Sequence, residues 1–208
     1  MSGGGRIFLV RHGQSEGNRE RRFSPNPHIE LTAVGEAQAR AAGRWLAERA
    51  RPGRIVSSPF RRARTTASWI ATELGFAGEI ELEPGLRERE IGELAGRPYA
   101  ALVEHPSYDV ERFWEWRPRG GESLVEVQAR AAPVLERLVA TAAETDVVVV
   151  SHGGVMLALC AHVEGGWHRP RVARNCEIVR IERGAGRLRV AESVRVAEAA
   201  SAEELVGR

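Results

Sequence analysis

Short apolar runs alternate with longer amphipathic stretches along most of this chain. The apolar runs at 6–10, 54–57 and 146–150 have the length of buried strands. Helical periodicity and helix-end signals predict helices over 32–49 and 61–74. Strands that alternate with helices form mostly parallel sheets covered on both faces. The chain is therefore expected to be a three-layer α/β/α sandwich with a mostly parallel central sheet.

One irregular stretch interrupts this alternation. Residues 84–121 carry only a short predicted helix, at 99–104, and have the character of an insertion or lid on a single domain that spans 1–208. The other predicted elements are a strand at 80–82, a helix at 122–143 that is bent or interrupted near Pro133, a helix at 154–163, and a hairpin over 176–194.

Composition and charge narrow the class of protein. Apolar residues make up 43% of the 208 residues and charged residues 28%, as in soluble globular proteins. No stretch approaches the ~20 apolar residues of a membrane helix, so no membrane partner is expected. The net charge of +2 argues against a nucleic-acid partner. Cys160 and Cys176 have no metal-ligand spacing and fit a reducing, cytoplasmic location.

Three of the predicted strands end in residues of the same kind. Arg11 and His12 follow the first strand, Arg62 lies shortly after the second, and His152 follows the strand at 146–150. Parallel α/β sheets bind ligands beyond the carboxyl ends of their strands, so these side chains are expected to meet in one pocket. Such a set suits a dianion. A phosphoryl group is the commonest one, and arginine binds its oxygens bidentately.

The arginines next to His12 bear on its charge. Two like charges about 4 Å apart cost about 4 kcal/mol at an effective dielectric of about 20. An imidazole flanked by Arg11 and Arg62 should therefore stay neutral near pH 7. Its free lone pair can attack phosphorus while the guanidinium groups stabilise the phosphoryl oxygens. Ser15 and Asn18 supply neutral hydrogen bonds from the following loop.

The same chemistry needs an acid for the leaving oxygen and needs no metal. Glu88, Glu90 and Glu93 are the candidate acids, and composition alone does not choose among them. The flanking arginines repel a cation, and no carboxylate is spaced to complete a zinc site with the histidines. Neither a metal nor another cofactor is expected.

Four motifs, in order along the chain, resemble those of the histidine phosphatase superfamily, which includes the cofactor-dependent phosphoglycerate mutases. They are LVRHGQS at 9–15 with Asn18, SSPFRRARTTA at 57–67, LREREIGELAG at 86–96 and VSHGG at 150–154. The resemblance covers residues 6–165, and the hairpin at 175–194 also fits. It implies a phosphoglycerate mutase-like fold and metal-free chemistry.

The resemblance also implies roles for matching positions. His12 would be the phosphorylated nucleophile and Glu88 the proton donor, while the phosphoryl group would be held by Arg11, Arg62 and His152. The candidate substrate contacts are Asn18, Ser15, Ser24, Gly153, Arg117 and Arg119.

Departures from the mutase pattern favour a phosphatase. Gly154 stands where such mutases usually have Asn, and Ile91 stands where they have Tyr. Arg117 and Arg119 are separated by Pro118 instead of forming an adjacent pair. Each departure removes a contact that would retain a bisphosphorylated intermediate, so that water would complete the reaction.

The sequence thus predicts a metal-independent phosphatase that hydrolyses small phosphomonoesters through a phosphohistidine on His12. Two alternatives stay open: a phosphotransfer isomerase of the phosphoglycerate mutase type, and a catalytically silent domain that binds phosphorylated ligands. The expected partner is a small phosphorylated metabolite. The natural substrate and the oligomeric state, a homodimer included, are left open.

Overall fold

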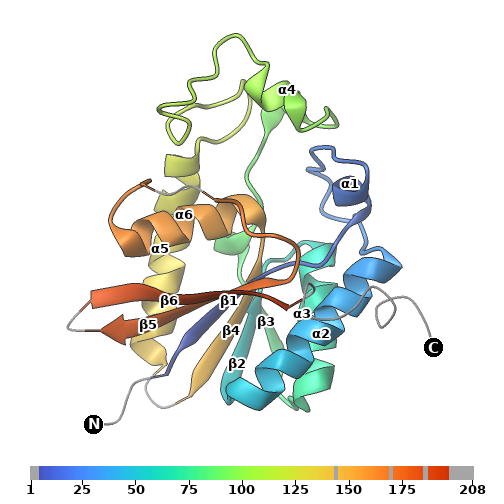
Figure 1. Ribbon diagram of the computed structural model, residues 1–208, viewed down its shortest axis with the longest axis vertical. Helices are drawn as coiled ribbons and strands as arrows, with labels where there is room; N and C mark the ends of the chain where they lie inside the picture. Colours follow the sequence, from blue (N-terminus) through green and yellow to red (C-terminus); the bar gives the residue numbers. More distant parts are fainter. Residues whose placement is uncertain (1–4, 143–144, 169–170, 185–186, 197–208) are drawn as a thin grey trace.

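The computed structural model describes residues 5–142, 145–168, 171–184 and 187–196. At its centre is a six-stranded sheet with the strand order β3-β2-β4-β1-β5-β6 (Figure 1). The first four strands in this order are parallel, and the β5–β6 hairpin joins antiparallel at β1. The strands are β1 (Ile7–Arg11), β2 (Pro52–Ser57), β3 (Ile80–Leu82), β4 (Asp146–Ser151), β5 (Glu177–Gly184) and β6 (Arg187–Arg195).

Helices cover both faces of the sheet (Figure 1). The two layers are α2 (Ala33–Arg49) with α3 (Arg61–Leu74), and α5 (Leu124–Thr141) with α6 (Gly153–Glu164). Successive strand side chains point to opposite faces, so Val148 and Val150 pack in the core under α2 and α3, while Val147 and Val149 pack under α5 and α6. The predicted three-layer α/β/α sandwich is confirmed.

Local signals place the helix ends. Thr32 caps α2 by accepting a hydrogen bond from the Gly35 amide at 3.1 Å. Gly75 closes α3 at a φ of 62°, a left-handed conformation that glycine adopts without strain. The remaining short helices are α1 (Glu16–Arg19), α4 (Ala100–Val103) and the 3₁₀ turns η1 (Pro84–Leu86) and η2 (Gly92–Leu94).

The helix that the sequence predicts to be bent or interrupted near Pro133 is not interrupted, because α5 runs unbroken from Leu124 to Thr141. A proline removes the hydrogen bond to the carbonyl four residues earlier. Both Pro133 and Ala129 lie on the exposed side of α5, where water can satisfy that carbonyl. The predicted hairpin is present as β5 and β6, although residues 185–186 of its turn lie outside the described residues.

Residues 84–121, here called the lid segment, rise above the carboxyl ends of the parallel strands (Figure 1). The segment has a small core of its own, in which Ile91, Leu94 and Trp116 are buried. Backbone hydrogen bonds tie it to the loop after α1: Phe23 N donates to Arg97 O, and Tyr99 N donates to Arg21 O, each at 2.9 Å. The lid segment is thereby held over one edge of the sheet. None of the described helices is long and apolar enough to cross a membrane.

Candidate active site

The site begins where three neighbouring parallel strands end. In the sheet, Arg11 of β1 is level with Ser151 of β4, and Val150 is level with Ser57 of β2. The residues that follow these strands therefore emerge side by side. The rings of His12 and His152 lie with their centroids 5.1 Å apart. The predicted convergence of the strand ends is confirmed.

His12 is held in one tautomer and kept uncharged. Its Nδ1 lies 2.7 Å from the carbonyl oxygen of Gly13, which can only accept, so Nδ1 carries the proton. Nε2 therefore presents a lone pair, and Arg62 Nε donates to it at 3.2 Å. Burial, and then the charges of Arg62 and Arg11, hold the pKa of His12 well below its usual value. This direction agrees with the neutral imidazole that the sequence predicts, but burial contributes most to it, and the sequence argument considered only charge.

His152 is fully buried and is oriented by a residue that the sequence analysis did not single out. Its Nε2 lies 2.7 Å from Ser58 Oγ, just beyond the end of β2. Its Nδ1 is buried without a hydrogen-bond partner and lies 4.0 Å from Glu88 Oε2. Burial, followed by the charge of Arg62, lowers the pKa of His152 well below its usual value. We assign the tautomer in which Ser58 donates to Nε2, because Nδ1 then carries the proton on the side that faces Glu88.

Arg62 is buried, Arg11 is partly buried, and both line the same cavity beside His12. Arg11 donates from NH1 to Ala173 O at 2.6 Å, while its Nε is buried without a partner. Arg62 lies in the first turn of α3 and donates from NH1 to Asn26 O at 3.3 Å. Only three buried side-chain nitrogen or oxygen atoms in the described part of the chain lack a partner, and Arg11 Nε and His152 Nδ1 are two of them. Buried donors are nearly always satisfied, so this pair points to an anion-binding position.

Among the three candidate acids, only Glu88 reaches this position. Its Oε1 accepts from the Arg89 amide at 2.9 Å, which leaves Oε2 directed toward His152. Glu90 and Glu93 are exposed and do not line the cavity. The glycine at 154 gives Glu88 its space, because a Cβ there would lie 2.9 Å from Glu88 Oε1.

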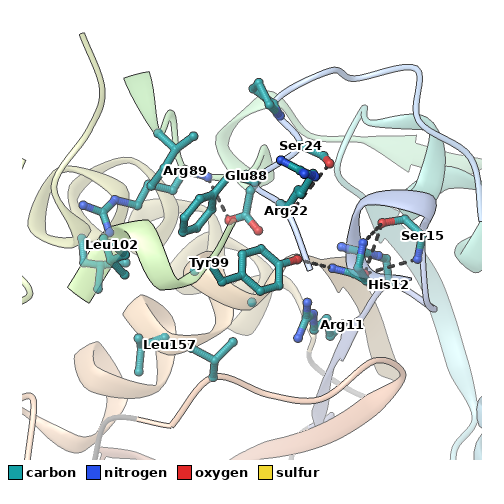
Figure 2. Close-up of a pocket in the computed structure, with 18 of the residues that line it drawn as sticks. Arg11, His12, Ser15, Arg22, Ser24, Glu88, Arg89, Tyr99, Leu102 and Leu157 are labelled. Atoms are coloured by element: carbon teal, nitrogen blue, oxygen red, sulfur yellow. Dashed lines mark hydrogen bonds between the residues drawn. The ribbon is translucent and has the colours of Figure 1, made fainter. Parts of the chain in front are cut away.

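A cavity of about 620 Å³ opens above these residues, beneath the lid segment (Figure 2). Of the predicted substrate contacts, Ser15, Asn18, Ser24 and Gly153 line it. Arg117 and Arg119 do not. Arg117 donates from Nε to Gly121 O at 2.8 Å, and its NH1 forms an ion pair with Glu126 Oε1 at 3.1 Å. The backbone amide of Arg119 donates to Glu93 Oε1 at 3.0 Å. Both arginines are thus engaged outside the cavity, although the sequence places them among the candidate substrate contacts.

Two further residues of the site carried no signal in the sequence. Tyr99 of the lid segment accepts a hydrogen bond from Asn18 Nδ2 at 2.9 Å (Figure 2). Asn175 donates to His12 O at 3.0 Å and to Asn18 Oδ1 at 2.9 Å. Asn175 is 163 positions from His12, and its contact depends on how β5 joins the sheet at β1.

Among the described residues, no group of three or more His, Cys, Asp or Glu side chains is arranged to hold a metal ion. The arginines on either side of His12 would also repel a cation there.

Fold and site define a class of α/β proteins in which histidines and arginines at the ends of parallel strands form an anion site. Within that class, the chain matches the model of the histidine phosphatase superfamily (branch 1) over residues 7–195, and it belongs to this family.

Its relatives include enzymes of two kinds. A glucosyl-3-phosphoglycerate phosphatase of Mycobacterium tuberculosis is 36% identical over 168 residues, which are 75% of this chain and 74% of the relative. A 2,3-bisphosphoglycerate-dependent phosphoglycerate mutase of Methylorubrum populi is 34% identical over 172 residues, 76% of this chain and 79% of the relative. The structure of a mycobacterial glucosyl-3-phosphoglycerate phosphatase in complex with VO3 superposes with a TM-score of 0.80 at 30% identity, covering 90% of this chain and 97% of that one.

Proposed function

We propose that this chain is a metal-independent phosphatase that hydrolyses small phosphomonoesters through a phosphohistidine on His12. The observation that carries the proposal is the state of the His12 ring. Nδ1 is committed to Gly13 O, and the Nε2 lone pair faces the buried guanidinium of Arg62. A neutral, oriented imidazole beside preorganised cations is what a nucleophile toward a phosphate dianion requires.

In the first step the substrate's phosphoryl group displaces Arg62 Nε from His12 Nε2 and takes hydrogen bonds from Arg11, Arg62 and His152. The Nε2–P bond forms, the ester P–O bond breaks, and Glu88 gives a proton to the leaving oxygen. In the second step the Glu88 carboxylate accepts a proton from water as that water attacks phosphorus. The Nε2–P bond breaks, inorganic phosphate leaves, and Glu88 holds the proton taken from the attacking water, ready for the next cycle.

The site supports hydrolysis over isomerisation of phosphoglycerates. An isomerase has to hold the carboxylate of a bisphosphorylated intermediate, and Arg117 and Arg119 lie outside the cavity. Without a carboxylate clamp the dephosphorylated alcohol leaves, and water completes the second step. The proposal includes a single domain over 1–208 with the lid segment covering the site, Asn18, Ser15, Ser24 and Gly153 as substrate contacts, a cytoplasmic location and a small phosphorylated metabolite as substrate.

Phosphate release, isomerisation and labelling of the protein test the proposal together. The wild type should release phosphate from a panel of phosphomonoesters in the presence of EDTA and should carry an acid-labile label after brief incubation with ³²P-substrate. His12→Ala should do neither. Interconversion of 2- and 3-phosphoglycerate without phosphate release would favour the isomerase. Binding without label or release would favour the silent phospholigand-binding domain.

A further inference from the structure

The cavity is much larger than a phosphoryl group requires. Its volume of about 620 Å³ lies within the range of sites for drug-sized ligands. Arg11, His12 and Arg62 occupy one end. Away from them the wall is mostly hydrocarbon or aromatic, and Figure 2 shows Leu102 and Leu157 on the side away from His12 and Ser15. The main apolar contributors are Phe23, Tyr99, Leu102, Phe113, Leu157 and Leu124.

The charged groups of this wall are largely engaged with the protein itself. Beyond the phosphate end, the described cations that line the cavity are Arg22 and Arg89. Arg89 donates from Nε to Glu122 O at 2.7 Å and from NH2 to Trp116 O at 2.9 Å, which fixes it in the lid segment. Arg22 donates to the Gly96 carbonyl at 3.0 Å. A carboxylate on the substrate would therefore compete with the contacts of Arg89 and would face Glu88, and the cation of this wall open to it is Arg22, which is exposed to solvent.

The apolar wall continues outward past the mouth of the cavity. Val110 and Val172 line the cavity and are nevertheless 73% and 52% exposed. Phe113 also lines it and packs edge-on against Trp114 and Trp167, whose rings are stacked at 6.1 Å. Exposed apolar surface that is continuous with a pocket marks a ligand-binding groove. The surface can accept an organic group longer than the enclosed part of the cavity.

We propose that the organic group of the substrate is predominantly apolar, so that the enzyme acts on alkyl or aryl phosphomonoesters in preference to phosphorylated sugars, hydroxy acids or amino acids. This inference rests on the proposed phosphatase function. Hydroxyl or carboxylate groups brought against this wall would lose water without gaining hydrogen bonds. An alkyl or aryl group would gain burial against Leu102, Leu157 and Phe113.

A series of linear alkyl phosphates, from ethyl to octyl, isolates this effect because the basicity of the leaving oxygen barely changes along it. Full burial of a methylene corresponds to about a fourfold change in an equilibrium constant. The wall is partly open, so kcat/KM should rise about two- to threefold per methylene. Glycerol 3-phosphate, phosphoserine and 3-phosphoglycerate should fall at or below the value for ethyl phosphate.

Exposed positions allow variants that leave the fold intact. Val110→Asn and Val172→Asn should reduce the gain per methylene for the longer chains. Val103→Asn is the matched control, because Val103 lies in α4, is 66% exposed and does not line the cavity. Its chain-length profile should match the wild type.

The outcomes separate this inference from the proposed function. Turnover with a flat alkyl series, or a higher kcat/KM for the polar esters, would overturn the apolar substrate class and leave the phosphatase in place. The same series as alkylphosphonates, measured by calorimetric binding, reports on the wall without turnover. Affinity that rises with chain length in a protein that hydrolyses no ester would support the wall and overturn the phosphatase. Affinity independent of chain length would overturn the wall.

Discussion

Glu88→Gln should slow the hydrolysis of alkyl phosphates far more than that of aryl phosphates. Glu88 Oε1 accepts from the Arg89 amide, and Oε2 faces the anion position at 4.0 Å from His152 Nδ1. Glutamine keeps the shape and the acceptor toward Arg89 but has no proton to transfer. A general acid contributes on the order of 10²–10⁴-fold. A loss of about 10²–10³-fold in kcat/KM is expected for an alkoxide leaving group, which needs that proton.

Nitrophenolate leaves without a proton, and kcat/KM covers only the steps up to its release, so kcat/KM of the variant for nitrophenyl phosphate should stay within about threefold of the wild type. Glu88 faces the same anion position, but the arginines and His152 that hold the dianion are unchanged in the variant, so Glu88→Gln should not raise KM. The assay is steady-state phosphate release over a set of esters whose leaving-group basicity spans the alkyl to nitrophenyl range, plotted against that basicity for both proteins.

Glu90→Gln and Glu93→Gln are the matched controls, since both carboxylates are nearby in sequence, exposed and outside the cavity. Each should reproduce the wild-type plot. Equal slowing of alkyl and aryl esters by Glu88→Gln would refute its role as the acid. Loss of a proton donor slows esters with basic leaving groups most, so it has to make the plot of kcat/KM against leaving-group basicity steeper. A steep plot for Glu90→Gln or Glu93→Gln would move the role to that residue.

Three further predictions follow from the same contacts. Arg62→Ala should lower kcat/KM by about 10²–10³-fold, while Arg61→Ala, an exposed neighbour paired with Glu30 at 2.9 Å, should stay within about twofold in the same assay. Nitrogen NMR of His12 should show a neutral ring protonated at Nδ1 from pH 8 to pH 5.5, because its pKa is lowered; a titration near pH 6.5 would contradict the burial argument. Although burial opposes it, hydrogen bonds from Arg171 lower the pKa of Glu177 to about 2. This contribution to the free energy of unfolding is fully present above about pH 4.5 and is lost as pH falls toward 2. Arg171 is about half exposed, so solvent screening reduces the contribution to about 2 kcal/mol. Urea unfolding should show a difference of about 2 kcal/mol in the free energy of unfolding between wild type and Glu177→Gln at pH 6, and a much smaller difference at pH 3.

The strand ends were predictable because their geometry is local. The valines at 147–150 make this run apolar on both sides, so a buried strand is expected there, and it is observed as Asp146–Ser151. Parallel strands then deliver their following residues to one edge, which is why His12, Arg62 and His152 could be grouped before any coordinates. The strand order itself, and the antiparallel joining of β5, depend on pairings between distant segments that no local pattern encodes.

The other members of the site depend on irregular chain. Tyr99 reaches Asn18 because the lid segment follows a path fixed by its own small core and by backbone bonds to the loop after α1. The same path turns Arg117 toward Gly121 and away from the cavity. Periodicity does not describe such a path, so the sequence pattern could place neither Tyr99 in the site nor Arg117 outside the cavity.

The cluster of two arginines and two histidines is unfavourable for the protein alone, and binding of an anion accounts for it. Arg11 Nε and His152 Nδ1 are buried donors without partners, and an unsatisfied buried donor costs about 1–3 kcal/mol. Burial and mutual repulsion keep both imidazoles neutral, so the cluster gains nothing from ion pairing with them. A phosphoryl dianion satisfies the free donors and the arginine charges together, whereas a neutral organic group satisfies none of them. Most of the binding free energy therefore comes from the phosphoryl group, and contacts with the apolar wall determine which organic groups are preferred.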